Sequence, residues 1–191
     1  GFAGLWSVEV DASLAAIGRE RFLADSHIAV HHQDSAAFLQ AVLPALGQTP
    51  ILFWLDAHFP GADYGRADYR DERNLAMRLP LERELTLIRK LRPAASDVIL
   101  IDDLRIYEPG PFFAGDLPEY AQTLPEAERH LAFISTLFKT SHRILRHYDD
   151  QGYVILLPKT GRAKHILSPM GRKTLAAHLE QAWRLGQQET A

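Results

Sequence analysis

Short apolar runs alternate along the first hundred residues with segments whose apolar side chains recur every three or four positions. The runs are typical of strands buried in a sheet, and the longer spacing is typical of amphipathic helices. The pattern predicts strands over 5–10, 27–33, 51–55 and 97–101, with helices over 11–24, 35–46 and 80–92 between them. Strands that alternate with helices in this way favour an α/β fold built on a parallel sheet.

The second half of the chain departs from that alternation. A helix is expected to open at Pro125, followed by strands 142–147 and 153–157, which Asp149-Asp150-Gln151-Gly152 joins as a β-hairpin. Two stretches rich in turn residues, 59–79 and 107–124, predict long loops, and 170–185 predicts a last amphipathic helix. The expected organisation is an α/β domain over residues 1–160 and a C-terminal helical extension over 161–191.

Composition narrows the classes of partner. The chain has 191 residues, which suits a single domain. Its 21 basic and 24 acidic residues give a net charge of -3, so no nucleic-acid partner is expected. The absence of cysteine excludes disulfides and thiolate metal sites. No apolar run reaches membrane-spanning length and no signal peptide is visible, so the expected location is cytoplasmic, without a membrane partner.

Acidic residues follow two of the predicted strands directly. Asp56 comes after the run 51–55, and Asp102 with Asp103 comes after the run 98–101. Ligands of open α/β sheets bind beyond the carboxyl ends of the strands, so these carboxylates would converge if the two strands are neighbours. Hard oxygen donors at one spot suit Mg²⁺ or a similar divalent ion.

Three further polar residues lie at predicted strand ends, and each keeps more than one reading. Glu9 is either a ligand-binding group or a solvated strand terminus. Asp34 is either a ligand-binding group or the N-cap of the helix that follows it. His58 could abstract a proton, bind or orient a metal ion, or serve only structure, since its ordinary pKa suits proton transfer near neutral pH.

Four segments, taken in order, resemble a known family. They are Ser7-Val8-Glu9-Val10-Asp11, Asp34-Ser35-Ala36-Ala37-Phe38-Leu39, Phe53-Trp54-Leu55-Asp56-Ala57-His58 and Val98-Ile99-Leu100-Ile101-Asp102-Asp103. Their order and spacing resemble the class I S-adenosylmethionine-dependent methyltransferases, and within these the metal-dependent O-methyltransferases of the catechol, caffeoyl-CoA and macrocin types. The resemblance covers most of residues 5–158. It implies a doubly wound, Rossmann-like, mostly parallel sheet with a C-terminal antiparallel hairpin, whose first strand and glycine-rich loop lie upstream of Gly1.

The resemblance also implies roles for individual residues. Glu9 would hold the ribose hydroxyls of S-adenosylmethionine, and Asp34 and Ser35 would face its adenine. The implied metal ligands are Asp56, Asp102 and Asp103, with Mg²⁺ as the expected ion. Asp56 and His58 are the expected catalytic residues, because His58 stands near the position where catechol-type enzymes carry a lysine base. The implied reaction transfers a methyl group in line to a hydroxyl of a small molecule.

Two other functions remain open. Asp56-Ala57-His58 also resembles the Asp-x-Asp or Asp-x-His metal motif of nucleotide-sugar transferases. Alternatively, the domain is a methyltransferase-like binding or assembly module without catalysis. The sequence leaves the substrate and the oligomeric state open, with a homodimer as one option.

Overall fold

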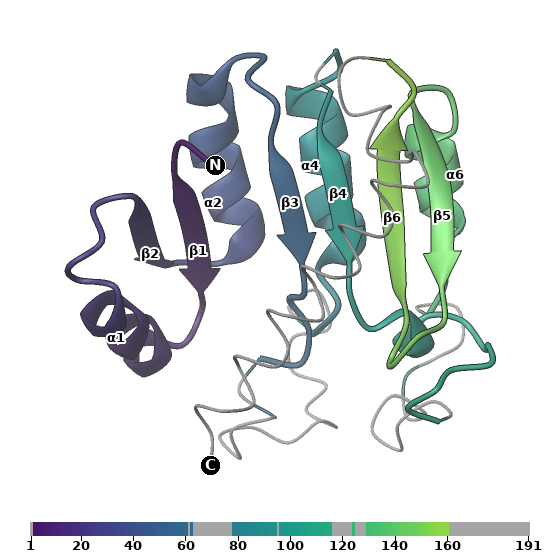
Figure 1. Cartoon of the computed structure of the whole chain (residues 1–191), viewed down its shortest axis with the longest axis horizontal. Coiled ribbons are helices and arrows are strands. Elements are labelled where there is room, and N and C mark those ends of the chain that lie inside the picture. Colours follow the sequence, from purple (N-terminus) through teal and green to yellow (C-terminus); the bar gives the residue numbers. More distant parts are fainter. Residues whose placement is uncertain are drawn as a thin grey trace.

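The computed structural model of the chain describes residues 2–60, 62, 78–94, 96–115, 124 and 129–160. The predicted helix over 170–185 and the extension over 161–191 lie outside these ranges. Within them the chain has an α/β architecture (Figure 1). None of its described helices is long and apolar enough to cross a membrane.

All six predicted strands are present, with ends shifted by one residue at most. The strands are β1 (Leu5–Glu9), β2 (Ile28–His32), β3 (Leu52–Leu55), β4 (Val98–Ile101), β5 (His142–His147) and β6 (Tyr153–Pro158). The helical elements are α1 (Ala12–Arg21), α2 (Ser35–Val42), η1 (Leu43–Leu46), α4 (Leu81–Leu91), η3 (Leu104–Ile106) and α6 (Ala132–Phe138). The alternation read from the sequence is therefore confirmed for the first four strands.

The strands form two sheets instead of one. β1 pairs with β2 in parallel, and the second sheet has the order β3-β4-β6-β5. Within that sheet β3 and β4 are parallel, whereas β6 lies antiparallel between β4 and β5. The predicted hairpin and the neighbouring β3 and β4 are confirmed. The larger sheet is mixed because β6 alone runs antiparallel to its neighbours, while the β1–β2 sheet is parallel.

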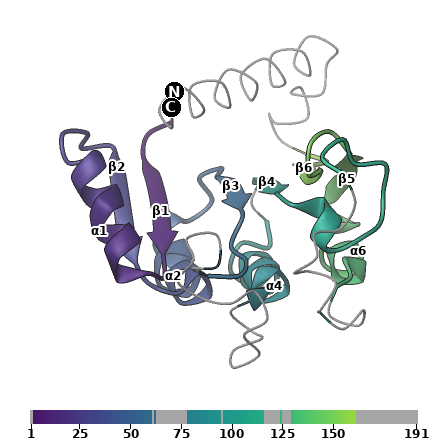
Figure 2. The same cartoon turned by 90° about the horizontal axis from the view of Figure 1, so that it is seen from below.

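Helices α2, α4 and α6 lie along one face of the strands (Figure 2). The main core fills that side and includes Leu39, Leu85, Ile99, Ile101 and Ile134. Alternate residues of β4 and β6 point to the opposite face, where Leu100, Ile155 and Leu157 form a second cluster. Both α1 and α2 begin at capped residues, since Asp11 accepts from Ser13 and Leu14 N–H and Asp34 accepts from Ala37 N–H.

One detail of the expected fold is wrong. The strand at 51–55 was expected to be buried on both faces, yet Trp54 is 55% exposed while its neighbours Phe53 and Leu55 are buried. In the described sheets β3 is an edge strand, and Trp54 lines the groove beside that edge, which leaves its side chain accessible. Residues 125–128, where the next helix was expected to open, lie outside the described residues, and the described helix α6 begins at Ala132 after its N-cap Leu131.

A buried ion pair fixes the amino edge of the larger sheet. Arg92, just after α4, donates from Nε and Nη2 to the two carboxylate oxygens of Asp97, at 2.7 and 2.8 Å. The same guanidinium donates to the backbone carbonyls of Gly47 and Thr49. Asp97 also accepts from Ile51 N–H, so the pair joins α4, β4 and the start of β3. This anchor lies at the opposite end of the strands from the acids described next.

Candidate functional site

A groove separates the two sheets. It runs between β1 and β3, has a volume of about 1110 Å³, and is lined by residues of both strands. The amino-terminal part of its lining is apolar and includes Leu5, Trp6 and Leu52. The acidic residues and the histidine of the lining gather at the carboxyl ends of the strands and the nearby helix starts, and are Glu9, Asp34, Asp56, His58, Glu84 and Asp103, with Ser35 beside Asp34. The groove is large enough for a cofactor-sized ligand.

Asp56, His58 and Asp103 form a compact cluster in this groove. Their possible ligand atoms all lie within 4.8 Å of one another. Nε2 of His58 lies 2.6 Å from Oδ2 of Asp103 and 3.4 Å from Oδ1 of Asp56. β3 and β4 pair in parallel, so the residues that follow them meet at one edge of the sheet. The predicted convergence of Asp56 and Asp103 is thus present, with His58 between them.

The imidazole of His58 bridges the two carboxylates. Burial by itself lowers the pKa of His58, but the hydrogen bonds to Asp103 and Asp56 and the charges of both raise it to about 10. In the metal-free protein His58 is therefore protonated at neutral pH. A protonated imidazole cannot accept a proton, so in this state His58 acts as the counter-charge of the cluster.

Asp102 lies beside the cluster but is not a member of it. Its Oδ1 accepts a hydrogen bond from the backbone N–H of Asp103 at 2.9 Å. Burial raises the pKa of Asp102 to about 6, and the negative charges of Asp56 and Asp103 act in the same direction. Of the three predicted metal ligands, two therefore meet, while Asp102 supports the turn that presents Asp103.

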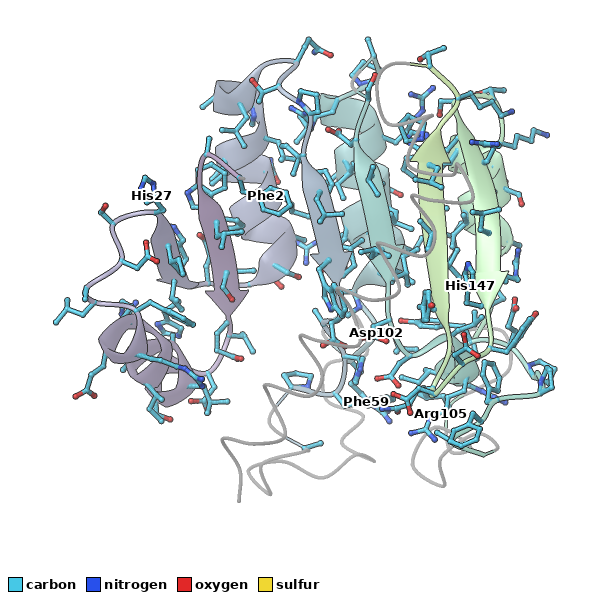
Figure 3. The ribbon with its side chains drawn as sticks, in the orientation of Figure 1. Phe2, His27, Phe59, Asp102, Arg105 and His147 are labelled. Atoms are coloured by element: carbon cyan, nitrogen blue, oxygen red, sulfur yellow. The ribbon has the colours of Figure 1, made fainter. Side chains whose placement is uncertain are left out.

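The backbone at both sides of the cluster is unusual. Asp103 has φ 52° and ψ 49°, and Phe59, which follows His58, has φ 39°. Residues other than glycine rarely adopt a positive φ, and those that do are concentrated at functional sites. Figure 3 shows Phe59 and Asp102 together where β3 and β4 end, with Phe2 at the far, amino end of β1. The left-handed turn after β4 is what directs Asp103 toward His58.

The predicted cofactor-binding residues line the same groove from the side of β1 and α2. Glu9 ends β1, and its Oε1 accepts from Asp11 N–H at 2.8 Å. Asp34 is the N-cap of α2 and lies 3.5 Å from Nη1 of Arg83. Its capping role is therefore present, and Ser35 stands next to it at the first position of the helix. Glu9 and Asp56 thus line the same groove.

Sequence reasoning missed one polar residue of this groove. Glu84 of α4 is only 2% exposed and hydrogen-bonds Ser35. A signal was available: Glu84 lies three residues after Leu81 and four before Ile88, on the apolar stripe that predicts the helix. A carboxylate at a core-facing position is rarely there for packing alone.

Comparison with known proteins adds no identity to this geometry. No protein-family model matches the chain, and a search of curated proteins finds no match.

Proposed function

We propose that this chain is an S-adenosylmethionine-dependent, divalent-metal-dependent O-methyltransferase that acts on a small hydroxylated molecule. One observation carries the proposal. The Asp56–His58–Asp103 cluster shares a groove with Glu9, Asp34 and Ser35, so the candidate metal ligands and the candidate cofactor-binding residues face one space.

The order of the strands supports the proposal. With the groove counted as one vacant position, the two sheets combine as β2-β1-vacant-β3-β4-β6-β5, with β6 antiparallel. This order suits a doubly wound, Rossmann-like sheet in which one strand position, between β1 and β3, is not filled by a described strand. The proposal concerns the ribose, adenine and metal ends of the site.

The donor set of the cluster suits a divalent ion. Oδ1 of Asp103 is buried without a hydrogen-bond partner, and a bound ion would satisfy this oxygen. Nδ1 of His58 is likewise buried without a partner. Two carboxylates suit Mg²⁺ or Mn²⁺, whereas an imidazole favours transition metals. We therefore expect Mn²⁺ or Zn²⁺ to compete with the Mg²⁺ that the resemblance implies. When bound, the ion would lower the pKa of an acceptor hydroxyl.

The remaining roles belong to the side chains of the groove. The carboxylate of Glu9 accepts one backbone hydrogen bond and keeps lone pairs for the two hydroxyls of a ribose. Asp34 and Ser35 lie at the far side of the groove, where an adenine would sit. The cofactor would supply the methyl group: its C–S bond breaks as the O–C bond forms, and the hydroxyl proton leaves to solvent or to a neighbouring base.

Titration calorimetry tests the proposal directly. The chain is titrated with S-adenosylhomocysteine and with UDP, each with Mn²⁺ and with chelator. We expect S-adenosylhomocysteine to bind and UDP not to bind. Thermal melts should show that Mn²⁺ stabilises the wild type and the control Asp149→Asn, an exposed site away from the groove, but not Asp56→Asn. No binding of S-adenosylhomocysteine would overturn the proposal.

One observation favours a second candidate. Asp56 and His58 lie in one cluster, as an Asp-x-His metal motif of a nucleotide-sugar transferase requires. Metal-dependent binding of UDP in the same titrations would support that function. Binding of neither compound would favour the non-catalytic module.

A further inference from the structure

A second cation, Arg105, stands at the carboxylate of Asp103. Its Nε lies 4.0 Å from Oδ1 of Asp103, while Oδ2 of the same carboxylate contacts His58. The side chain of Arg105 is 16% exposed. Among the residues that the structure describes, the groove lining includes Asp103 but not Arg105. The guanidinium therefore reaches the oxygen that His58 leaves, and it does so without occupying the ligand space.

The two atoms that face each other are both unsatisfied. Nε of Arg105 and Oδ1 of Asp103 are buried, and neither has a hydrogen-bond partner. They are a donor and an acceptor of opposite charge, but 4.0 Å is too long for a hydrogen bond. A buried donor and acceptor that stay apart cost stability, so packing alone does not explain the arrangement. What the guanidinium does supply is a positive charge on one side of the carboxylate.

Arg105 is held by the turn that joins β5 and β6. Its Nη2 donates to Oε1 of Gln151, and its Nη1 donates to the carbonyl of Ala114 at 3.4 Å. The backbone N–H of Arg105 also donates to the carbonyl of Gln151, at 3.1 Å. The preceding N–H, of Leu104, donates to the carbonyl of Gly152 at 2.9 Å. Figure 3 shows Arg105 beyond the carboxyl end of β4, so the turn is fastened directly after Asp103.

This turn has little freedom of its own. Gly152 has φ 75°, and a Cβ at this position would clash with the ring of Phe112. Phe112 belongs to the main core. The turn is therefore packed against the core, and Gln151 offers Arg105 a fixed acceptor.

We propose that Gln151 and Arg105 form a positioning relay for Asp103. Gln151 fixes the guanidinium, and the charge of the guanidinium holds Asp103 in the rotamer whose Oδ2 faces His58. The inference rests on the proposed function, because it takes Asp103 to be a ligand of the metal ion. Groups behind a metal ligand orient it, and their loss weakens metal binding by about 10- to 100-fold.

Titration of the chain with Mn²⁺ alone, by calorimetry, tests the relay. Gln151→Met removes the acceptor of Arg105, leaves every charge of the cluster unchanged, and should weaken Mn²⁺ binding by about tenfold. Arg105→Lys keeps the charge but lacks the planar fork that binds Gln151 while it faces Asp103, so it should weaken binding similarly. Gln40→Met, the same change as the first at an exposed position of α2, should keep the wild-type affinity.

The double variant separates a relay from two independent effects. Because both changes break one chain of contacts, Gln151→Met combined with Arg105→Lys should lose no more affinity than the larger single loss. Losses that add in the double variant would overturn the relay.

Melts in chelator separate positioning from structure. A merely structural role would lower the melting temperature of Gln151→Met or Arg105→Lys and leave the Mn²⁺ affinity of that variant at the wild-type value. That result would overturn the relay while the proposed function stands. Failure of the wild type to bind Mn²⁺ would instead overturn the metal site of the proposed function and the relay with it.

Discussion

Nε2 of His58 lies 2.6 Å from Oδ2 of Asp103, and this contact ties the residues after β3 to those after β4 across 45 positions of sequence. The contact matters because it places a positive charge between two carboxylates. The imidazolium thereby neutralises one of the two negative charges of the metal-free cluster. A divalent cation would take over the role of the imidazolium proton.

The first prediction concerns Asp56→Asn. Repulsion among Asp56, Asp102 and Asp103 alone would make the loss of one charge stabilising in the absence of metal. The protonated His58 attracts Asp56 and offsets that gain. The side chain of Asp56 is 52% exposed, so the metal-free free energy of unfolding should change by less than about 1 kcal/mol. The stabilisation by Mn²⁺ should be mostly lost, because amide oxygen binds hard cations less well.

Paired melts with Mn²⁺ and with chelator measure both effects, and Asp149→Asn serves as the control. An unchanged metal response in Asp56→Asn would show that Asp56 is not a ligand.

The second prediction uses the left-handed backbone of Asp103. Asp103→Gly and Asp103→Ala both remove the carboxylate, but only glycine adopts φ near 52° without strain. The glycine variant should therefore be more stable than the alanine variant by about 1 kcal/mol. Urea unfolding of the two variants measures the difference. Equal stabilities would mean that the turn relaxes and that Asp103 is not held in this conformation.

The third prediction concerns pH and Glu84. Its folded pKa of about 7 exceeds the ordinary value of 4.5, so folding takes up protons between these values. The stabilising contribution of Glu84 is complete below about pH 4.5 and is lost as pH rises through about 7. Glu84→Gln should consequently be more stable than the wild type at about pH 8, by about 2 to 3 kcal/mol, and the gain should vanish in acid.

Urea unfolding across this pH range checks the sign, with Glu82→Gln as the exposed control. If the difference in stability between Glu84→Gln and the wild type did not depend on pH, the raised pKa of the buried Glu84 carboxyl would be contradicted.

The fourth prediction tests the anchor at the amino edge. Arg92→Met leaves Asp97 as a buried carboxylate without its partner, since the two side chains are 0% and 4% exposed. Loss of one member of a buried ion pair should lower the free energy of unfolding by about 3 to 5 kcal/mol. Lys90→Met, an exposed change on the same helix, should alter it by less than about 0.5 kcal/mol. A small effect of Arg92→Met would mean that Asp97 finds another partner or gains water.

The elements of the fold could be predicted because each carries a local signal. Asp11 and Asp34 precede helices and do cap them, and the apolar runs at β3 and β4 are strands. Exposure of Trp54 could not be predicted, because it depends on whether a strand lies beside β3. That is a property of the assembled sheet and not of the run itself.

The candidate site was predictable to the extent that strand ends define it. Asp56 and Asp103 meet because parallel neighbours end at one edge. The place of His58 in the cluster was one of three readings of the sequence. The exclusion of Asp102 could not be predicted, since it depends on the left-handed turn at Asp103. Glu84 comes from a helix, and reasoning from strand ends does not reach it.

The two sheets share no described strand pairing, and this has a consequence for how the molecule responds to a ligand. α2 contacts both β1 and α4, so it is the principal described link between the β1–β2 unit and the larger sheet. Such a linkage allows the two units to lose their structure in separate steps. A ligand that binds Glu9 on one side of the groove and Asp103 on the other would link the two sheets. Its binding should then be visible as the merging of two melting transitions into one, in addition to a higher melting temperature.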